Sequence, residues 1–162
     1  MEFFSKAHSA YRRRAKRVVD QADPFEEERW YASYQAAVMG RDLQGLIEVV
    51  SLRPWRAEAA LECSAIAEAL GHVGTAFAYA LMASEASEYA SRDILFVDSS
   101  AYGFKSYDRL GTIAYYAGFY KVGYKACCTC LETYKDLLSP ADVVRIENNK
   151  AFYTAKLGEA PV

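Results

Sequence analysis

The residues best suited to chemistry are four cysteines, because thiolates bind metals and act as nucleophiles. Three of them crowd together at Cys127, Cys128 and Cys130, and the fourth is Cys63. Thiolates are soft ligands that suit zinc, but on a helix Cys128 points away from the line that joins its two neighbours. We therefore expect packing rather than metal binding, with Cys127 acting as a small buried hydrophobe.

Other catalytic groups are scarce. Only two histidines occur, His8 and His72, and a Ser–His or Cys–His nucleophile also needs an orienting group that the sequence does not supply. Four cysteines in 162 residues are too few for a disulfide scaffold. The sequence predicts free thiols in a reducing cytoplasm, with no metal, no cofactor and no stand-alone catalysis.

A basic segment near the N-terminus is a candidate binding element. Residues 1–23 carry six Lys or Arg against three Asp or Glu, although the whole chain has a net charge of −2. The cations cluster within one short stretch that contains Arg12, Arg13, Arg14, Lys16 and Arg17. Apolar residues repeat at helical spacing on another face, which predicts a basic amphipathic helix. Such a helix either caps the fold with solvated charges or contacts an acidic protein, nucleic acid or an anionic membrane. The net negative charge of the remaining chain disfavours general binding of nucleic acid.

Arg56 and Glu58 form a second candidate site at the start of a helix. The helix dipole favours Glu58 in the first turn but does not favour Arg56. This placement predicts that Arg56 has a partner. We expect a structural carboxylate, such as Glu26, Glu27 or Asp98, and a ligand-binding role is the alternative.

Tyrosines and two late asparagines supply further candidates. Five of the thirteen tyrosines lie close together in the sequence, at Tyr102, Tyr107, Tyr115, Tyr116 and Tyr120. Their ring faces and hydroxyls could line a groove for a protein or a carbohydrate, although we expect at least half of them in the core. Asn148 and Asn149 are expected to make hydrogen bonds between helices, because a buried amide without a partner is costly.

The elements that position these residues are predicted to be helices. The chain is 52% hydrophobic and 25% charged, as in an ordinary soluble domain. Apolar residues recur at helical spacing almost everywhere. The exception is the run 94–97, a small strand or, as we favour, a loop pressed onto helices. No run is long enough to span a membrane, and the N-terminus lacks the pattern of a secretory signal.

Prolines predict where three helices begin. Asp23-Pro24 and Ser139-Pro140 each offer a capping side chain followed by proline at the first helical position. Pro54 is expected to separate two helices, because the residue before proline is disfavoured in helical conformation.

Glycines indicate where pairs of helices turn. Gly40, Gly71 and Gly118 are expected to adopt the left-handed conformation between two helices, and each is followed five residues later by a small residue, namely Gly45, Ala76 and Gly123. The intervals between these glycines are 31 and 47 residues. The longer interval predicts an insertion at residues 87–104.

These corners resemble those of known helical repeats. The turns at Gly71 and Gly118, each with its following small residue, resemble tetratricopeptide turns. The segments 54–58 (PWRAE), 95–98 (LFVD) and 114–118 (AYYAG), with Tyr102 and Asn149, together resemble the helical-repeat region that follows the catalytic domain in some family 2 glycosyltransferases. The resemblance covers roughly residues 26–152. In such proteins the chemistry belongs to a nucleotide-sugar domain with an Asp-x-Asp metal site, and this sequence contains no Asp-x-Asp.

The predicted fold is therefore all-α. It is a tetratricopeptide-like α-solenoid of about three helical hairpins, near 26–53, 55–86 and 106–138, with capping helices at both ends. Residues 1–23 would form a basic helix or arm, residues 24–157 the repeat domain, and residues 158–162 a short tail.

The expected function is a non-catalytic scaffold that binds a protein, or a second copy of itself, through the concave face of the array. The candidate contact residues on the body are Arg56, Glu58, Asp98, Tyr102 and Tyr107. The alternative is an accessory carbohydrate-binding or glycosyltransferase-associated module, which the family resemblance implies.

Overall fold

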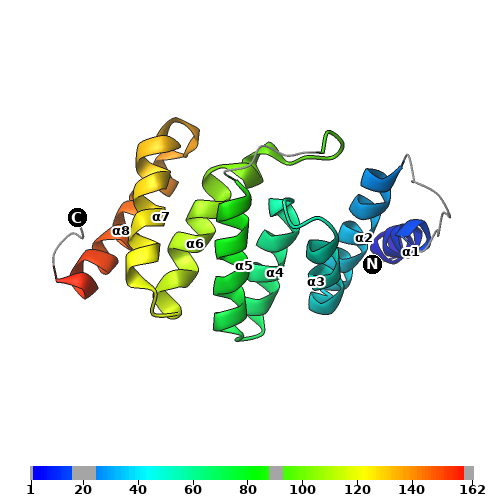
Figure 1. The fold of residues 1–162 in the computed structure, drawn as a ribbon, viewed down its shortest axis with the longest axis horizontal. Coiled ribbons are helices and arrows are strands. Elements are labelled where there is room, and N and C mark those ends of the chain that lie inside the picture. Colours follow the sequence, from blue (N-terminus) through cyan, green and yellow to red (C-terminus); the bar gives the residue numbers. More distant parts are fainter. Residues whose placement is uncertain (1, 16–24, 88–92, 159–162) are drawn as a thin grey trace.

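The chain forms a row of helices from one terminus to the other (Figure 1). The computed structural model describes residues 2–15, 25–87 and 93–158. Over these ranges it contains no strand, so the prediction of an all-α fold is confirmed. The α-helices are α1 (Glu2–Ala15), α2 (Glu26–Gly40), α3 (Leu43–Leu52), α4 (Ala57–Ala69), α5 (Val73–Ala86), α6 (Phe104–Tyr116), α7 (Tyr120–Thr133) and α8 (Pro140–Leu157). Two short 3₁₀ helices, η1 (Ser99–Tyr102) and η2 (Lys135–Leu137), precede α6 and α8. None of the helices described combines the length and the hydropathy that a membrane span requires.

Local sequence signals explain several helix starts. Ser139 accepts a hydrogen bond from the backbone N–H of Asp142 at 3.1 Å, and Pro140 opens α8, as predicted. The link between α3 and α4 contains Pro54, also as predicted. The start of α2 differs from the prediction. Its N-cap residue is Phe25, with no side-chain cap, and the expected capping residue Asp23 lies outside the described residues.

The three turns between paired helices share one hydrogen-bond pattern. In each turn, a residue with positive φ donates its N–H three residues back, and the next residue donates its N–H five residues back. Gly71 (φ 78°) and Gly118 (φ 80°) occupy the left-handed position as predicted. In the first turn the prediction of Gly40 was wrong, because Arg41 takes that position with φ 49° and Gly40 is the last residue of α2.

This one-residue difference also changes the small-residue position. The three equivalent residues are Leu46, Ala76 and Gly123, since each donates its N–H to the carbonyl of the N-cap residue that begins the second helix. Gly45 is therefore not the counterpart of Ala76 and Gly123. All three equivalent positions are buried, so the second helix of each pair packs on the first at this point.

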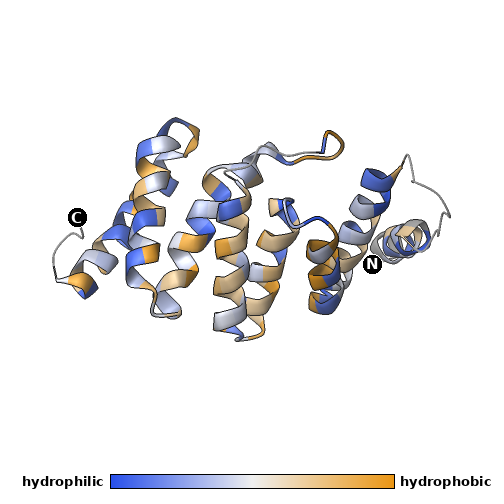
Figure 2. Cartoon of the chain, in the orientation of Figure 1, coloured by the Kyte–Doolittle hydropathy of each residue, from blue (hydrophilic) through white to orange (hydrophobic). Residues whose placement is uncertain are grey.

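Packing follows the order of the sequence. Each α-helix contacts the next one along the chain, and α6 also contacts both α4 and α8. Alanine fills much of the interface between α4 and α5, including Ala59, Ala60, Ala76 and Ala80, which are at most 1% exposed. The most hydrophobic ribbon lies in α3, α4 and α5 (Figure 2). Because the alanines between α4 and α5 are small, the backbones of these two helices can approach closely.

The run 94–97 lies in a loop, as we favoured. Residues 93–98 form no strand, and they lie against α2 before the chain continues into η1 and α6 (Figure 1). This loop joins the N-terminal ends of α2 and α4, and the candidate site is found there.

Candidate functional site

Arg56 is the centre of the candidate site. It is the N-cap residue of α4 and is only 1% exposed. Its Nε donates to Glu58 at 3.2 Å, and one terminal nitrogen donates to Asp93 at 3.1 Å. The guanidinium group also lies over the ring of Trp30, 4.3 Å from the centroid. A buried arginine is stable only when its donors are used, and these contacts use them.

Arg56 also fixes the backbone of the loop. Its terminal nitrogens donate to the carbonyl oxygens of Leu95 at 3.2 Å and Phe96 at 3.0 Å. Because guanidinium presents several donors in a rigid plane, one side chain can bind carboxylates and backbone carbonyls at the same time. The loop is thus attached to the first turn of α4.

Arg53 is a second buried cation in this site. It forms an ion pair and hydrogen bond with Asp93, and its other terminal nitrogen lies 3.1 Å from Glu26. Trp55 donates its indole N–H to the same Asp93 oxygen at 3.3 Å. Asp93 therefore accepts from Arg53, Trp55 and Arg56. We call Arg53, Arg56, Glu58 and Asp93 the Arg56 network.

Carboxylates hold the remaining backbone of the loop. Glu27 of α2 accepts from the N–H groups of Ile94 at 3.0 Å and Leu95 at 2.7 Å. Glu58 accepts from the N–H of Asp98 at 3.0 Å. These hydrogen bonds join residues that are far apart in the sequence, and they attach the loop to both α2 and α4.

The loop presents apolar side chains to solvent. Ile94 is 86% exposed, Leu95 is 40% exposed and Phe96 is 51% exposed. We call these three residues the apolar loop. Phe96 has φ 55°, which costs a bulky residue about 1–2 kcal/mol, and its ring stacks on Tyr31 of α2 at 4.4 Å. The backbone conformation is therefore imposed by the surrounding hydrogen bonds.

Arg56 binds structural carboxylates, as predicted, but the carboxylates named in the prediction were wrong. The network uses Glu58 and Asp93, whereas Glu26 pairs with Arg53 and Glu27 binds the loop backbone. The sequence does contain a signal for Asp93, since it is a charged residue placed directly before an apolar run. The contact joins residues 37 positions apart, so local patterns could not pair them.

Two of the other predicted body residues, Tyr102 and Asp98, contact the network at Glu58. Tyr102 donates its hydroxyl to Glu58 at 2.8 Å. Asp98 is half exposed and pairs with Lys105 at 3.1 Å. Burial raises the pKa of Asp98, but hydrogen bonds from Ser100 and Lys105 outweigh it and leave the pKa below the usual value. Tyr107 lies apart from them, stacked on Tyr134 at 5.8 Å.

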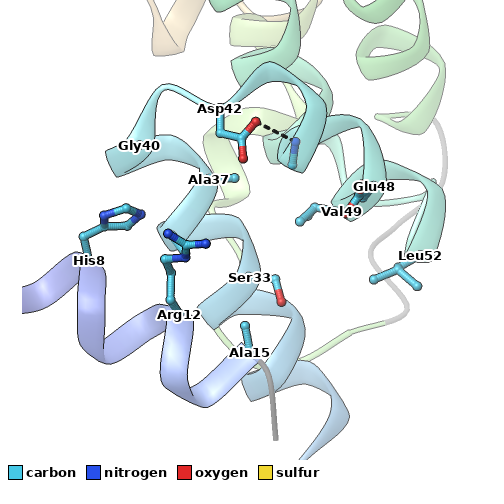
Figure 3. Close-up of a pocket in the computed structure, with 12 residues that line it drawn as sticks. His8, Arg12, Ala15, Ser33, Ala37, Gly40, Asp42, Glu48, Val49 and Leu52 are labelled. Carbon is cyan, nitrogen blue, oxygen red and sulfur yellow. Dashed lines mark hydrogen bonds between the residues drawn. The ribbon is translucent and has the colours of Figure 1, made fainter. Parts of the chain in front are cut away.

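The basic helix α1 packs along α2. His8 and Arg12, one turn apart, project from α1 into a cleft of about 570 Å³ that α2 and α3 complete (Figure 3). Arg13 is exposed, the side chain of Arg14 is not described, and Arg17 lies outside the described residues. The packing of α1 agrees with a capping helix, and contact between its arginines and an anionic partner stays a prediction.

The cleft beside α1 carries charges of both signs. Arg12 and His8 line one wall, and Asp42, the N-cap of α3, and Glu48 within α3 line another part. The Asp42 carboxylate accepts from the N–H of Gly45 at 3.0 Å as the cap of α3 (Figure 3). This carboxylate therefore has a structural role in the turn.

The cysteines are packing residues. Cys63, Cys127 and Cys130 are buried, and burial raises the pKa of each thiol to about 12. Among the residues that the structure describes, no group of three or more His, Cys, Asp or Glu side chains could hold a metal. Cys128 lies apart from its neighbours at intermediate exposure, as its helical position predicts.

We expect Cys128 alone to react rapidly with Ellman's reagent in the folded chain. A thiol with a pKa near 12 is about one part in 10,000 thiolate at pH 8, so the buried cysteines react slowly. Absorbance at 412 nm should show one fast thiol, and Cys128→Ser should abolish this phase. Three or four fast thiols in the native chain would contradict the burial of the other cysteines.

Comparison of the chain with protein-family models, curated proteins and solved structures finds no match.

Proposed function

We propose that this chain is a non-catalytic protein-interaction module. Its framework would be a tetratricopeptide-like α-solenoid, and its main anchor would be the apolar loop. The observation that carries the proposal is that three exposed apolar side chains stand on a backbone fixed by buried charges. Helical arrays of this kind commonly use their extended surface to bind other macromolecules.

The congruence of the three turns supports a repeating framework. Each turn has a left-handed residue and the same two backbone hydrogen bonds. Pairs α2 with α3, α4 with α5, and α6 with α7 would be the repeated hairpins. Helices α1 and α8 would cover the two ends, which an array of this kind requires.

Arginine bridges support a layer made of α4 and α6, which are first helices of these pairs, and the end helix α8. Arg109 of α6 donates to the hydroxyl and carbonyl oxygens of Ser64 in α4, both at 2.7 Å. Arg145 of α8 forms two hydrogen bonds with Asp108 of α6, at 2.8 and 2.9 Å. Helices α4, α6 and α8 are thereby linked side by side, as in the inner layer of a solenoid.

The energetics of the Arg56 network favour a positioning role. Buried ion pairs often contribute no more stability than apolar residues of similar volume. The network therefore needs a reason beyond stability. It determines the backbone of the apolar loop, including the strained φ of Phe96. A preorganised loop lowers the entropy lost on binding, which is the advantage we assign to it.

The charges near the loop favour a protein partner. The side chain of Glu26 is 64% exposed and that of Asp98 is 50% exposed. Both carboxylates are ion-paired, Glu26 with Arg53 and Asp98 with Lys105, so neither pair offers an uncompensated positive charge to the phosphates of nucleic acid or anionic lipid. An apolar pocket on a neutral or basic protein surface would accommodate Ile94, with contacts extending onto the layer of α2, α4 and α6.

The proposal is tested by affinity capture with three baits: the unchanged chain, Ile94→Asp and Leu137→Asp. Leu137 is a matched control, because it is 67% exposed but lies in η2, away from the loop. We expect at least one protein that the unchanged chain and Leu137→Asp retain equally and that Ile94→Asp retains at least tenfold less. Loss of a central apolar anchor has effects of this size.

The purified partner should show the same tenfold difference in Kd by calorimetry. Light scattering measures whether the chain also associates with itself, and self-association that Ile94→Asp abolishes would make the partner a second copy. A monomer whose captured proteins are identical for all three baits would overturn the proposal.

A further inference from the structure

A second cleft lies at the opposite end of the molecule, between α6 and α8. It has a volume of about 260 Å³. Helix α6 contributes Thr112, Tyr115 and Tyr116, and α8 contributes Asn149, Phe152 and Tyr153. None of the residues that line it is charged. An uncharged cleft selects a neutral ligand, because an ionic ligand would lose hydration without gaining a counter-charge.

Aromatic rings form most of the wall. Tyr116 is 69% exposed and Phe152 is 61% exposed, although both are large apolar groups at the surface. Tyr115 lies between them, tilted by 83° to Tyr116 and by 59° to Phe152. Tyr115 is also tilted by 67° to Tyr153, so none of its ring contacts in this cleft is a parallel stack.

The cleft is also lined by two polar side chains, Asn149 and Thr112. The prediction that Asn148 and Asn149 link helices was wrong: Asn148 is exposed, and the side-chain amide of Asn149 makes no hydrogen bond to any residue that the structure describes. The Asn149 amide thus keeps two donors and one acceptor beside the rings. Thr112 already donates to the carbonyl of Asp108 at 3.0 Å, and its oxygen can still accept.

We propose that this cleft binds the neutral pyranose ring of a carbohydrate. A pyranose has an apolar C–H face that packs on tilted aromatic rings, and hydroxyls at its edge that donate and accept. The Asn149 amide can bind two neighbouring hydroxyls with its donor and acceptor atoms. The rings of Tyr116 and Phe152 would cover the C–H face. The cleft is large enough for one sugar unit and leaves the rest of an oligosaccharide in solvent.

This site is independent of the proposed protein-binding surface. The apolar loop contacts α2 and α4, whereas the cleft belongs to α6 and α8. Variants of Ile94 should leave sugar binding unchanged, and variants of Asn149 should leave protein capture unchanged. The sugar-binding proposal and the protein-binding proposal can therefore fail independently of each other.

Saturation-transfer difference NMR tests the proposal. The probes are methyl β-glucopyranoside, methyl α-mannopyranoside and methyl N-acetyl-β-glucosaminide at about 10 mM, since binding of a single sugar unit in a small open cleft is expected in the millimolar range. Adenosine is the flat, neutral comparison. We expect saturation of the ring protons of at least one glycoside, stronger than any saturation of adenosine.

Two variants and a matched control assign the signal to the cleft. Asn149→Ala and Phe152→Ala should each reduce it at least fivefold, whereas Asn148→Ala, on the neighbouring exposed residue, should retain it. Circular dichroism and thermal melting confirm that each variant is folded before titration. The proposal is overturned if no glycoside is saturated, if adenosine is preferred, or if both cleft variants bind as well as the unchanged chain.

Discussion

Replacing Arg56 with alanine is expected to lower the free energy of unfolding by about 3–5 kcal/mol, because the change removes the cation bound to buried Glu58 and one of the two cations bound to buried Asp93. Glu58 would lose its hydrogen-bonded cation, and Asp93 would keep only Arg53, in a site where both carboxylates are largely buried. The carbonyl oxygens of Leu95 and Phe96 would also lose their donor. Urea denaturation followed by circular dichroism at 222 nm measures the change.

Arg145→Ala is the matched control for this prediction. Like Arg56, Arg145 binds two carboxylates, here Asp108 and Asp142, but its side chain is 45% exposed. An exposed ion pair contributes about 0–1 kcal/mol, so this variant should be much less affected. Equal losses in the two variants would show that burial of the Arg56 network does not determine its energetic weight.

Arg56→Lys separates charge from geometry. Lysine keeps the positive charge but cannot hold two carboxylates and two carbonyls in one plane. We expect a stability between those of the unchanged chain and Arg56→Ala. Hydrogen exchange of the Ile94 and Leu95 amides should accelerate in both variants, because the carbonyl anchors of the loop are weakened although Glu27 remains. Unchanged exchange would separate the loop from the network and remove the positioning role assigned to it.

Features set by neighbouring residues could be predicted from the sequence. Ser139 caps α8 because its hydroxyl reaches the third residue of the same helix. Gly71 and Gly118 end helices because glycine adopts positive φ without a steric cost. The helical period and these boundaries are local, so an all-α chain of paired helices follows from them.

The first turn shows where a local signal fails. Gly40 offered the expected glycine, yet the left-handed residue is Arg41. The burial of Leu46, 0% exposed, and the cap from Asp42 to Gly45 determine the register of α3. Packing of a large apolar side chain thus outweighed the preference of glycine for positive φ, which is a small energy.

The site was only partly predictable because its contacts are long range. The position of Arg56 after Pro54 indicated that it needs a carboxylate partner. That partner, Asp93, follows Arg56 in the sequence only after two whole helices, α4 and α5. Asn149 gave the opposite error. We expected the Asn149 amide to be buried and to bind a neighbouring helix, but the fold places it beside a cleft between α6 and α8. Both outcomes depend on which helices become neighbours.

Gly123→Ala is expected to destabilise the chain by about 2–4 kcal/mol, through overpacking and the loss of a buried hydrogen bond. A Cβ at Gly123 would lie 2.1 Å from the ring of Tyr153. Tyr153 cannot easily move, because it is 1% exposed and its hydroxyl donates to the carbonyl of Gly111 at 2.8 Å. Thermal and urea unfolding of the variant measure the loss.

Two further variants show whether this contact is the cause. Gly74→Ala also replaces a helical glycine, but nothing lies within 4 Å of its added carbon, so it should be neutral or stabilising by up to about 1 kcal/mol. Combining Gly123→Ala with Tyr153→Leu removes the ring that would clash. The double variant should therefore be less destabilised than the sum of its two single changes. Additive losses, or a Gly123→Ala chain as stable as Gly74→Ala, would show that α7 and α8 are not packed as closely at this point as the structure describes.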